Sequence, residues 1–311
     1  MNSTSADYLG LSPVLIALRT CFIAIIALLI ISGNILSIAV TRRVTNLADS
    51  TKVLMTSLAV SDLLVGFLSL FYTIASALDK WPFGNMGCQI FVICSTACFI
   101  MSINSLTFLN IERYIAITRP YKFTLWCTRR RAITIVAMSS ILCLSVGPLS
   151  MVLLNRSAEY FEGPTICFFS NTSPVFSITN LLVGDLYPTF LMVFIYYRLI
   201  KISRQHEQRL NQNGNNEANN NHNKALKTFL VVTLTFFGCY TPFLLVNAAE
   251  SFTGVPSPNW LQFLTAWLNT SNSMFNVWIY CLFNSSFRQV AKTILLKTFP
   301  CRDRSVAPVV T

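Results

Sequence analysis

The side chains best suited to chemistry in this sequence are ionisable residues inside, or at the ends of, long apolar segments. Asp62 lies in Ser-Leu-Ala-Val-Ser-Asp-Leu-Leu, Asp185 lies in a second apolar segment, and Glu112-Arg113-Tyr114 ends a third. An unpaired charge costs several kcal/mol in hydrocarbon. These positions are therefore candidates for ion pairing or ligand binding.

Residue sets typical of catalysis are missing from the sequence. It has two His residues, His206 and His222, and its ten Cys residues form no Cys-x-x-Cys pair. It also contains no Gly-rich phosphate loop, no His-Glu-x-x-His segment and no recognisable catalytic set of Ser, His and Asp. Because acid–base catalysis and transition-metal sites rely on such groups, we expect no enzyme activity and no organic cofactor.

Seven apolar segments must position the candidate residues. The 311-residue chain is 53% apolar and 11% charged, with a mean hydropathy of +0.56, whereas a soluble domain has about 25% charged residues. A helix that crosses a bilayer needs about 20 mostly apolar residues. Suitable segments cover residues 15–41, 52–78, 86–118, 131–154, 175–200, 225–250 and 260–283. We therefore expect an all-α membrane protein, a seven-transmembrane helix bundle.

The basic residues predict the orientation of this bundle. If the seven segments cross the membrane in turn, all but three of the 23 Lys and Arg residues fall on one side. The exceptions are Arg19, Lys80 and Arg156. Because loops rich in Lys and Arg stay in the cytoplasm, we expect the N-terminus outside and the C-terminus inside. This asymmetry explains the net charge of +11 without any binding to nucleic acid.

The remaining segments complete the domain organisation. We expect residues 1–14 to be extracellular, residues 15–283 to form the transmembrane domain, and residues 284–311 to be cytoplasmic. Within the transmembrane domain, the Asn-rich segment 205–223 is predicted to be a disordered cytoplasmic loop. Asn-x-Ser/Thr sequons in the outer segments predict glycosylation at Asn2, Asn155 and Asn171.

Short motifs occur in order along these segments. They are Gly33-Asn34, Leu58 to Asp62, Trp81-Pro-Phe-Gly before Cys88, Glu112-Arg113-Tyr114, Cys167, Pro188 with Tyr196, Phe236 with Cys239-Tyr-Thr-Pro242, and Asn276-Val-Trp-Ile-Tyr280. In this combination the chain resembles the rhodopsin-class (class A) G-protein-coupled receptors. The resemblance also implies a short amphipathic eighth helix that opens with Phe287-Arg288.

The resemblance implies a receptor in the plasma membrane. Such a protein binds an extracellular small-molecule ligand and activates a heterotrimeric G protein, with arrestin and a receptor kinase as further partners. A seven-pass transporter or channel is the alternative. It would be expected to show pore-lining charges or broken helices, for which Asp62 and Asp185 are little support.

Three positions depart from the family pattern. The fourth span lacks the family's Trp and is polar and small near Ser139, and Tyr240 replaces the Trp of the sixth span. Val277 replaces the Pro of the seventh span, so we expect that helix to be less kinked.

The resemblance assigns roles to several matching residues. It implies a disulfide between Cys88 and Cys167, which would hold the second outer loop over the ligand pocket. Cys301, beside Lys297 and Arg302, is a candidate palmitoylation site. The residues implied in G-protein coupling are Glu112, Arg113, Tyr114, Tyr196 and Tyr280, with Arg113 held by Glu112 at rest.

The family's sodium site has matches in this chain. Oxygen ligands from one carboxylate and neutral hydroxyls or amides suit a hard cation. A water-filled polar network without an ion is the alternative interpretation. The matching residues are Asp62, Ser102, Asn272, Ser273 and Asn276.

The ligand is only partly constrained. Ser95 stands where amine receptors carry the Asp that pairs with the ligand, which argues against a standard amine receptor. The lack of any Lys between Lys227 and Lys292 excludes a retinal Schiff base. Phe169 and Asn247 match an aromatic and an amide of adenosine receptors, although ordinary pocket lining is the alternative. The candidate ligand-binding residues are Ser95, Phe169, Asn180, Asp185, Tyr240 and Asn247.

Asp185 has two interpretations. In the first, the Tyr240 hydroxyl donates a hydrogen bond to the Asp185 carboxylate across the gap between spans five and six. In the second, Asp185 binds a cationic ligand and takes over the task that Ser95 cannot perform.

Overall fold

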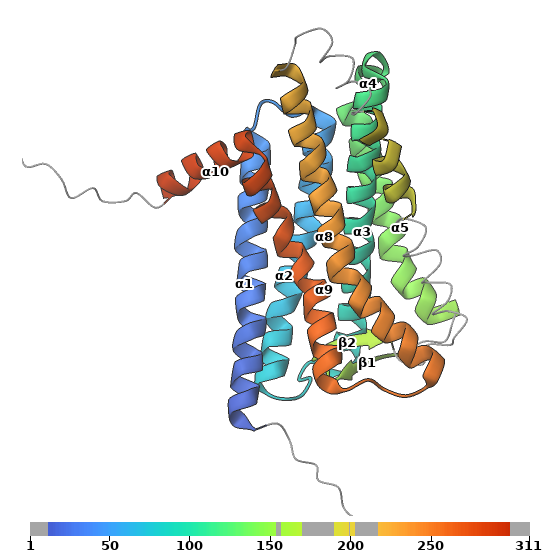
Figure 1. Ribbon diagram of the computed structural model, residues 1–311. Coiled ribbons are helices and arrows are strands. Elements are labelled where there is room, and N and C mark those ends of the chain that lie inside the picture. Colours follow the sequence, from blue (N-terminus) through green and yellow to red (C-terminus); the bar gives the residue numbers. More distant parts are fainter. Residues whose placement is uncertain (1–11, 154–156, 170–189, 199, 203–216, 299–311) are drawn as a thin grey trace, which may run out of the picture.

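The computed structural model describes residues 12–153, 157–169, 190–198, 200–202 and 217–298, and its long helices lie side by side (Figure 1). The helices are α1 (Pro13–Arg43), α2 (Asp49–Ala77), α3 (Gly84–Thr118), α4 (Pro120–Trp126), α5 (Arg129–Leu153), α8 (Glu217–Thr253), α9 (Asn259–Phe283) and α10 (Ser285–Thr298), and residues 190–198 and 200–202 are also helical. This is the all-α architecture that the sequence predicts.

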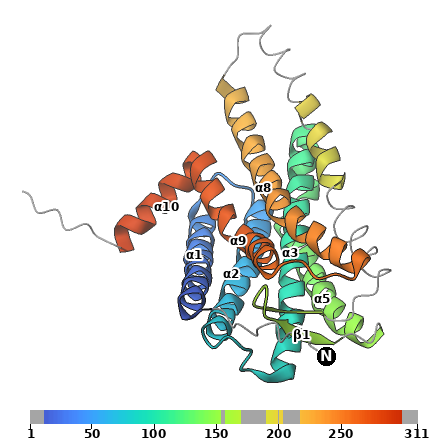
Figure 2. The ribbon, with the colours of Figure 1, turned by 60° about the horizontal axis from the view of Figure 1, so that its bottom comes forward.

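A two-stranded hairpin covers one end of the bundle, which we call the hairpin end. β1 (Ala158–Phe161) pairs antiparallel with β2 (Ile166–Phe169), and Tyr160 is the register partner of Cys167. Both strands pack against α3, near the start of that helix (Figures 1 and 2). α4 and α10 lie at the opposite end, which we call the α10 end.

The bundle has the surface of a membrane protein. Within the described residues, five helices are long and apolar enough to cross a membrane: α1, α2, α3, Arg129–Leu149 of α5 and Leu230–Thr253 of α8. Large apolar side chains on their outer faces are exposed, such as Leu18 (62%), Ile25 (57%) and Leu142 (63%). Exposed apolar surface of this kind is unfavourable in water, and a surrounding bilayer removes that cost.

α9 corresponds to the predicted segment 260–283 but is not among these five helices. Its 25 residues extend about 37 Å at 1.5 Å per residue, which is enough to cross a bilayer. Its buried face includes Ser271, Asn272 and Asn276. α9 therefore brings hydrogen-bonding side chains into the centre of the bundle.

α8 begins earlier than the sequence predicts. The Asn-rich loop is predicted to be disordered through residue 223, but α8 begins at Glu217, so residues 217–223 are helical. Extending an existing helix costs far less than starting one, and Asn in a helix is only roughly 0.5–0.7 kcal/mol worse than Ala. The rest of that loop, and residues 175–189 of the predicted fifth span, lie outside the described residues.

α10 confirms the expected amphipathic eighth helix. Asn284 Oδ1 accepts a hydrogen bond from the Phe287 amide at 3.1 Å, which satisfies a free N–H of the first turn. Arg288 Nη1 donates to the Leu282 carbonyl at 3.0 Å and so joins α10 to the end of α9. Phe287 and Ala291, one helical turn apart, are buried, whereas Leu296 is 59% exposed. α10 thus turns away from α9 beside α1 (Figure 1).

Close packing of α1 on α2 depends on a glycine. A Cβ atom at Gly66 would lie 2.8 Å from Ile31 Cγ1 and 2.9 Å from Ile30 Cγ2, closer than real Cβ atoms approach their neighbours. Glycine at this position therefore lets α2 pack closely against Ile30 and Ile31 of α1.

Candidate functional site

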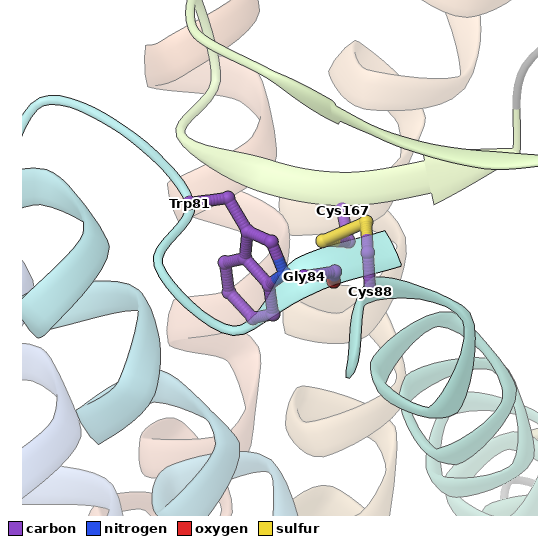
Figure 3. The surroundings of a disulfide bond; sticks show 4 residues. All are labelled: Trp81, Gly84, Cys88 and Cys167. Atoms are coloured by element: carbon purple, nitrogen blue, oxygen red, sulfur yellow. Dashed lines mark hydrogen bonds between the residues drawn. A yellow bond between two sulfur atoms is a disulfide. The ribbon is translucent and has the colours of Figure 1, made fainter. Parts of the chain in front are cut away.

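A disulfide attaches the hairpin to the bundle, as the resemblance implies. Cys88 in the first turns of α3 is bonded to Cys167 in β2, with the two Cα atoms 5.4 Å apart (Figure 3). Trp81 Nε1 donates to the Gly84 carbonyl at 2.8 Å and closes the turn that leads into α3. Gly84 has a φ of 70°, a conformation that glycine adopts without steric cost. The predicted pairing of these two Cys residues is confirmed.

Trp267 attaches the same hairpin to α9, which the sequence analysis missed. Its Nε1 donates to the Pro164 carbonyl at 3.0 Å, and its side chain is 1% exposed. On the other side of the hairpin, Tyr160 stacks on Trp81 with ring centroids 5.9 Å apart. Burial raises the pKa of Tyr160 to about 12, so its hydroxyl is neutral at physiological pH. The hairpin is therefore held at several points over the end of the bundle.

Below the hairpin lies a column of aromatic rings. Phe168 in β2 meets Phe243 in α8 at 5.9 Å, Phe243 meets Tyr240 at 6.5 Å, and Tyr240 meets Phe99 in α3 at 4.8 Å. Only Tyr240 was predicted among these four. Such contacts stabilise by about 0.5–1.5 kcal/mol each beyond the area buried, so a ligand that reaches this column is recognised largely by its apolar and aromatic surface.

The other described ligand candidates lie in the same three elements, β2, α8 and α3. Phe169 is 8% exposed and its ring lies 6.2 Å from that of Phe168. Asn247 Nδ2 donates to the Phe243 carbonyl of its own helix at 2.7 Å, so one amide N–H is already engaged. Ser95 is half-buried in α3. Phe168, one residue before the predicted Phe169, makes a ring contact with α8.

Asp62 lies in a buried polar cluster between α2, α3 and α9. Its carboxylate accepts hydrogen bonds from Ser102 Oγ at 3.1 Å and from Asn276 Nδ2 at 2.8 Å. Ser61 Oγ lies 3.0 Å from Ser102 Oγ and extends the cluster. Asp62 is 1% exposed, and these donors offset the loss of water around its carboxyl group.

An oxygen that suits a hard cation lies on α9, one helical turn before Asn276 of this cluster. Asn272 is 6% exposed, and its Oδ1 has no hydrogen-bond partner among the described residues. The neighbouring Ser273 is buried, and its carbonyl accepts from Asn34 Nδ2 of α1 at 2.9 Å. Carboxylate, hydroxyl and amide oxygens are suitable ligands for such a cation. The described part of the chain holds no group of three or more His, Cys, Asp or Glu residues that could bind a metal ion.

Tyr196 joins a second buried cluster, part of which the sequence analysis missed. Its hydroxyl donates to Asn110 Oδ1 at 2.7 Å and lies 3.3 Å from Thr233 Oγ1. Asn110 Nδ2 also donates to Thr233 Oγ1 at 3.2 Å. Three helical segments thus meet here: α3, residues 190–198 and α8. A polar pair at Asn110 and Thr233, each within an apolar stretch, was the available sequence signal.

Glu112 and Arg113 form the third cluster, near the α10 end, together with the start of α2. Arg113 Nη2 donates to Thr51 Oγ1 at 2.8 Å, and the Thr51 hydroxyl lies 3.0 Å from both carboxylate oxygens of Glu112. Ser50 Oγ donates to Glu112 as well. Thr51 therefore contacts both Glu112 and Arg113 and links them to α2, a partner that the sequence interpretation did not include.

Two more coupling candidates lie close to this third cluster in the fold. Tyr280 is 2% exposed and its ring packs on Phe287 of α10 with centroids 5.6 Å apart. Tyr114 is half-buried and packs against the apolar core. Six further candidates lie outside the described residues: Asn2, Asn155, Asn171, Asn180, Asp185 and Cys301.

Comparison with known proteins gives a consistent match. The family described as "7 transmembrane receptor (rhodopsin family)" matches residues 33–280. The dog histamine H2 receptor (Canis lupus familiaris) is 26% identical over 318 residues, which cover 98% of this chain and 85% of that receptor. The human histamine H2 receptor is 27% identical, and the alignment covers 86% of this chain and 77% of that receptor. Dopamine receptor 1 of Drosophila melanogaster is 26% identical, and the alignment covers 93% of this chain and 64% of that receptor.

Replacing Tyr196 with Phe is expected to lower the stability of the purified protein by about 1–3 kcal/mol, because Asn110 Oδ1 loses its donor in a buried site. Tyr197, the next residue, is 63% exposed, so Tyr197→Phe serves as a matched control and is expected to have little effect. Thermal unfolding in detergent measures both. Equal melting temperatures for the two variants would show that the Tyr196 hydroxyl does not hold the helices together.

Proposed function

The chain belongs to the rhodopsin family of seven-transmembrane receptors, and we propose that it transmits ligand binding from the aromatic column to the α10 end through α3. It is a ligand-binding G-protein-coupled receptor of the plasma membrane and not an enzyme. Family membership decides against the transporter or channel. One observation carries the proposed mechanism: α3 contributes a residue to the aromatic column and to all three polar clusters. These residues are Phe99, Ser102, Asn110, Glu112 and Arg113.

α8 connects the ligand site to the middle cluster. Tyr240 lies in the aromatic column, and Thr233, seven residues earlier in the same helix, contacts Asn110 and Tyr196. A ligand shifts a receptor between conformations only by contacting them unequally. A ligand that changes the packing of Tyr240 would therefore move α8 as a unit and change the contacts of Thr233.

The third cluster is the proposed contact point for the G protein. Separation of α8 from α3 would open the α10 end around Arg113, where an amphipathic helix of the G protein can bind in a groove. Thr51 ties Arg113 and Glu112 to α2 and so holds the guanidinium inside the bundle. Release of Arg113 from Thr51 would then accompany activation. Arrestin and a receptor kinase are proposed to use the same face.

We infer that the ligand is an organic amine bound in an unusual way. The similarity to histamine and dopamine receptors supports this class. Ser95 offers a hydroxyl and no charge at the position where amine receptors carry Asp. Asp185, in the predicted fifth span, is the proposed substitute. The adenosine-like alternative receives less support, because Asn247 already donates to a carbonyl of its own helix.

A sodium ion is proposed to bind beside Asp62. The Asp62 carboxylate and the Ser102 hydroxyl lie in one buried cluster. Asn272, whose Oδ1 has no partner among the described residues, lies one helical turn before Asn276 of that cluster. A cation there would offset the charge of a carboxylate that is 1% exposed. Ser273 and Asn276 are the remaining proposed ligands.

The hairpin end is proposed to face outside the cell. The disulfide between Cys88 and Cys167 supports this orientation, because disulfides persist in oxidising compartments. The basic residues support it as well, because Arg42, Arg43 and Arg288 lie toward the α10 end. Glycans at Asn2, Asn155 and Asn171, and a palmitoyl group at Cys301, are part of this proposal.

Replacing Arg113 with Ala is expected to abolish basal and serum-stimulated cAMP or calcium signals in transfected cells, because the proposed G-protein contact is removed. Arg43→Ala, an exposed Arg at the end of α1, is the matched control and should signal like the wild type. Wild-type signalling by Arg113→Ala at equal surface expression would contradict the mechanism.

In the same assay with histamine and dopamine as probes, Asp185→Asn should lose any amine response.

Sodium is expected to raise the melting temperature of the purified receptor relative to N-methylglucamine at equal ionic strength, because a ligand that binds only the folded state stabilises it. Asp62→Asn should abolish this sodium effect. Asp49→Asn alters an exposed carboxylate of the same helix and should keep it. A sodium shift that is unchanged in Asp62→Asn would place the ion elsewhere.

Digestion of the receptor from mammalian cells with an N-glycosidase is expected to lower its apparent mass. Changing Asn2, Asn155 and Asn171 together to Gln should remove this shift, because all three lie on the proposed outer side. The sequon at Asn284 lies at the start of α10 and should carry no glycan. A shift that persists in the triple variant would reverse the orientation.

A further inference from the structure

A ring of hydrogen bonds at the second polar cluster joins α3, α8 and the helical residues 190–198. The Tyr196 hydroxyl donates to Asn110 Oδ1 at 2.7 Å, and Asn110 Nδ2 donates to Thr233 Oγ1 at 3.2 Å. Because the Tyr196 proton points to Asn110, the Tyr196 oxygen is an acceptor toward the Thr233 hydroxyl, 3.3 Å away. The amide of Asn110 therefore both donates and accepts at the centre of this contact. We call the three residues the Asn110 ring.

The Asn110 ring lies in the core of the bundle, where water cannot replace its contacts. Asn110 and Thr233 are each 2% exposed, and Tyr196 is 5% exposed. The buried side chains of Met192 and Val232, from the same helical segments as Tyr196 and Thr233, belong to the apolar core. A buried polar group that loses its partner bears the full cost of its lost hydration. The ring therefore favours the conformation in which its three segments lie together.

The Asn110 ring lies between the aromatic column and the third cluster. On α8, Thr233 stands seven residues, about two helical turns, before Tyr240. On α3, Asn110 stands one helical turn before Arg113. Both helices are continuous over these residues. A movement of α8 at Tyr240 therefore acts on α3 at Asn110, one turn from Arg113.

This contact cannot survive the proposed separation of α8 from α3. The distance of 3.2 Å from Asn110 Nδ2 to Thr233 Oγ1 is already at the upper end of the range for such bonds. A separation of about 0.5 Å between the two helices takes it beyond that range. The closed conformation thus has a contact that the open conformation lacks, and such a contact shifts the population toward the closed conformation.

We propose that Asn110 and Thr233 are positioning residues that set the basal activity of this receptor, by holding α8 against α3 until a ligand moves α8. The inference rests on the proposed function, because the closed conformation is the one that keeps the G protein away from Arg113. A ligand at the aromatic column then has to supply the free energy that breaks the contact between Asn110 and Thr233.

A ring with a structural role only would behave differently. It would form equally in the closed and open conformations, so removing one member would lower the stability of the receptor and leave or reduce its basal signal. Under the proposal, the same change destabilises the closed conformation alone, so the basal signal rises while the melting temperature falls. The two roles therefore predict different changes in basal signalling.

Asn110→Leu replaces the amide by an apolar group of similar size. Basal cAMP or calcium signalling in transfected cells is expected to rise about fivefold at equal surface expression, because the net value of one buried hydrogen bond corresponds to about that factor in the conformational equilibrium. Asn104→Leu changes the same residue type on the same helix, where Asn104 Nδ2 lies 3.6 Å from Cys143 Sγ. It is the matched control and should keep the wild-type signal.

Thr233→Val tests the ring from the other helix with a change that keeps the shape of the side chain. It should raise basal signalling by a similar factor. Thr235→Val, two residues further along α8 at a half-buried position outside the ring, is its control and should keep the wild-type signal. Thermal unfolding of the purified full-length variants shows that each remains folded.

Arg113→Ala separates this proposal from the proposed function. Added to Asn110→Leu, it should return the raised signal to background. A raised signal that persists in the double variant would support the ring and overturn Arg113 as the G-protein contact. Unchanged or lower basal signals in both Asn110→Leu and Thr233→Val, or equal rises in their controls, would overturn the proposal.

Discussion

Polar side chains at the centre of an apolar bundle must find their partners inside the protein, because hydrocarbon offers none. Asp62 is the most demanding case, since its carboxyl group is 1% exposed. Its donors come from two other helices, Ser102 of α3 and Asn276 of α9. The rotation of these helices is therefore tied to α2, and Asn34 ties α1 to the same α9 segment through the Ser273 carbonyl.

The same constraint explains why the clusters lie along α3. Each polar residue on the inward face of α3 needs a donor or acceptor from a neighbour: Ser102 meets α2, Asn110 meets α8, and Arg113 meets the start of α2. Apolar side chains such as Leu106 and Leu109 fill the spaces between them. Polar contacts specify the geometry of the clusters, and van der Waals packing of the apolar side chains between them holds the helices together. A movement at one cluster is therefore passed on through a close-packed core.

Departures from the family pattern have visible consequences in the packing. Val277, in place of the family's Pro, lies against Gly33, where a Cβ atom would be 3.6 Å from Val277 Cγ2. Tyr240, in place of Trp, still stacks on Phe99 and Phe236. Near the position of the missing Trp in the fourth span, Ser140 lines a cavity together with residues of α2 and α3. The replacements at Val277 and Tyr240 thus preserve contact between helices.

The sequence by itself determined the membrane-spanning bundle and the identity of Asp62, Glu112 and Arg113 as candidates, while the resemblance of its motifs implied the family and the disulfide partners. It could do so because hydrocarbon imposes length and apolarity on each span and makes isolated charges conspicuous. Only the tertiary structure decided the partners: Thr51 between Glu112 and Arg113, Asn110 and Thr233 at Tyr196, and Trp267 on the hairpin carbonyl of Pro164. Thr, Asn and Trp are common in spans and carry no charge, so their roles depend on helix rotation. That rotation follows from packing between residues far apart in the chain, as at Gly66 and Ile30, and no local pattern records it.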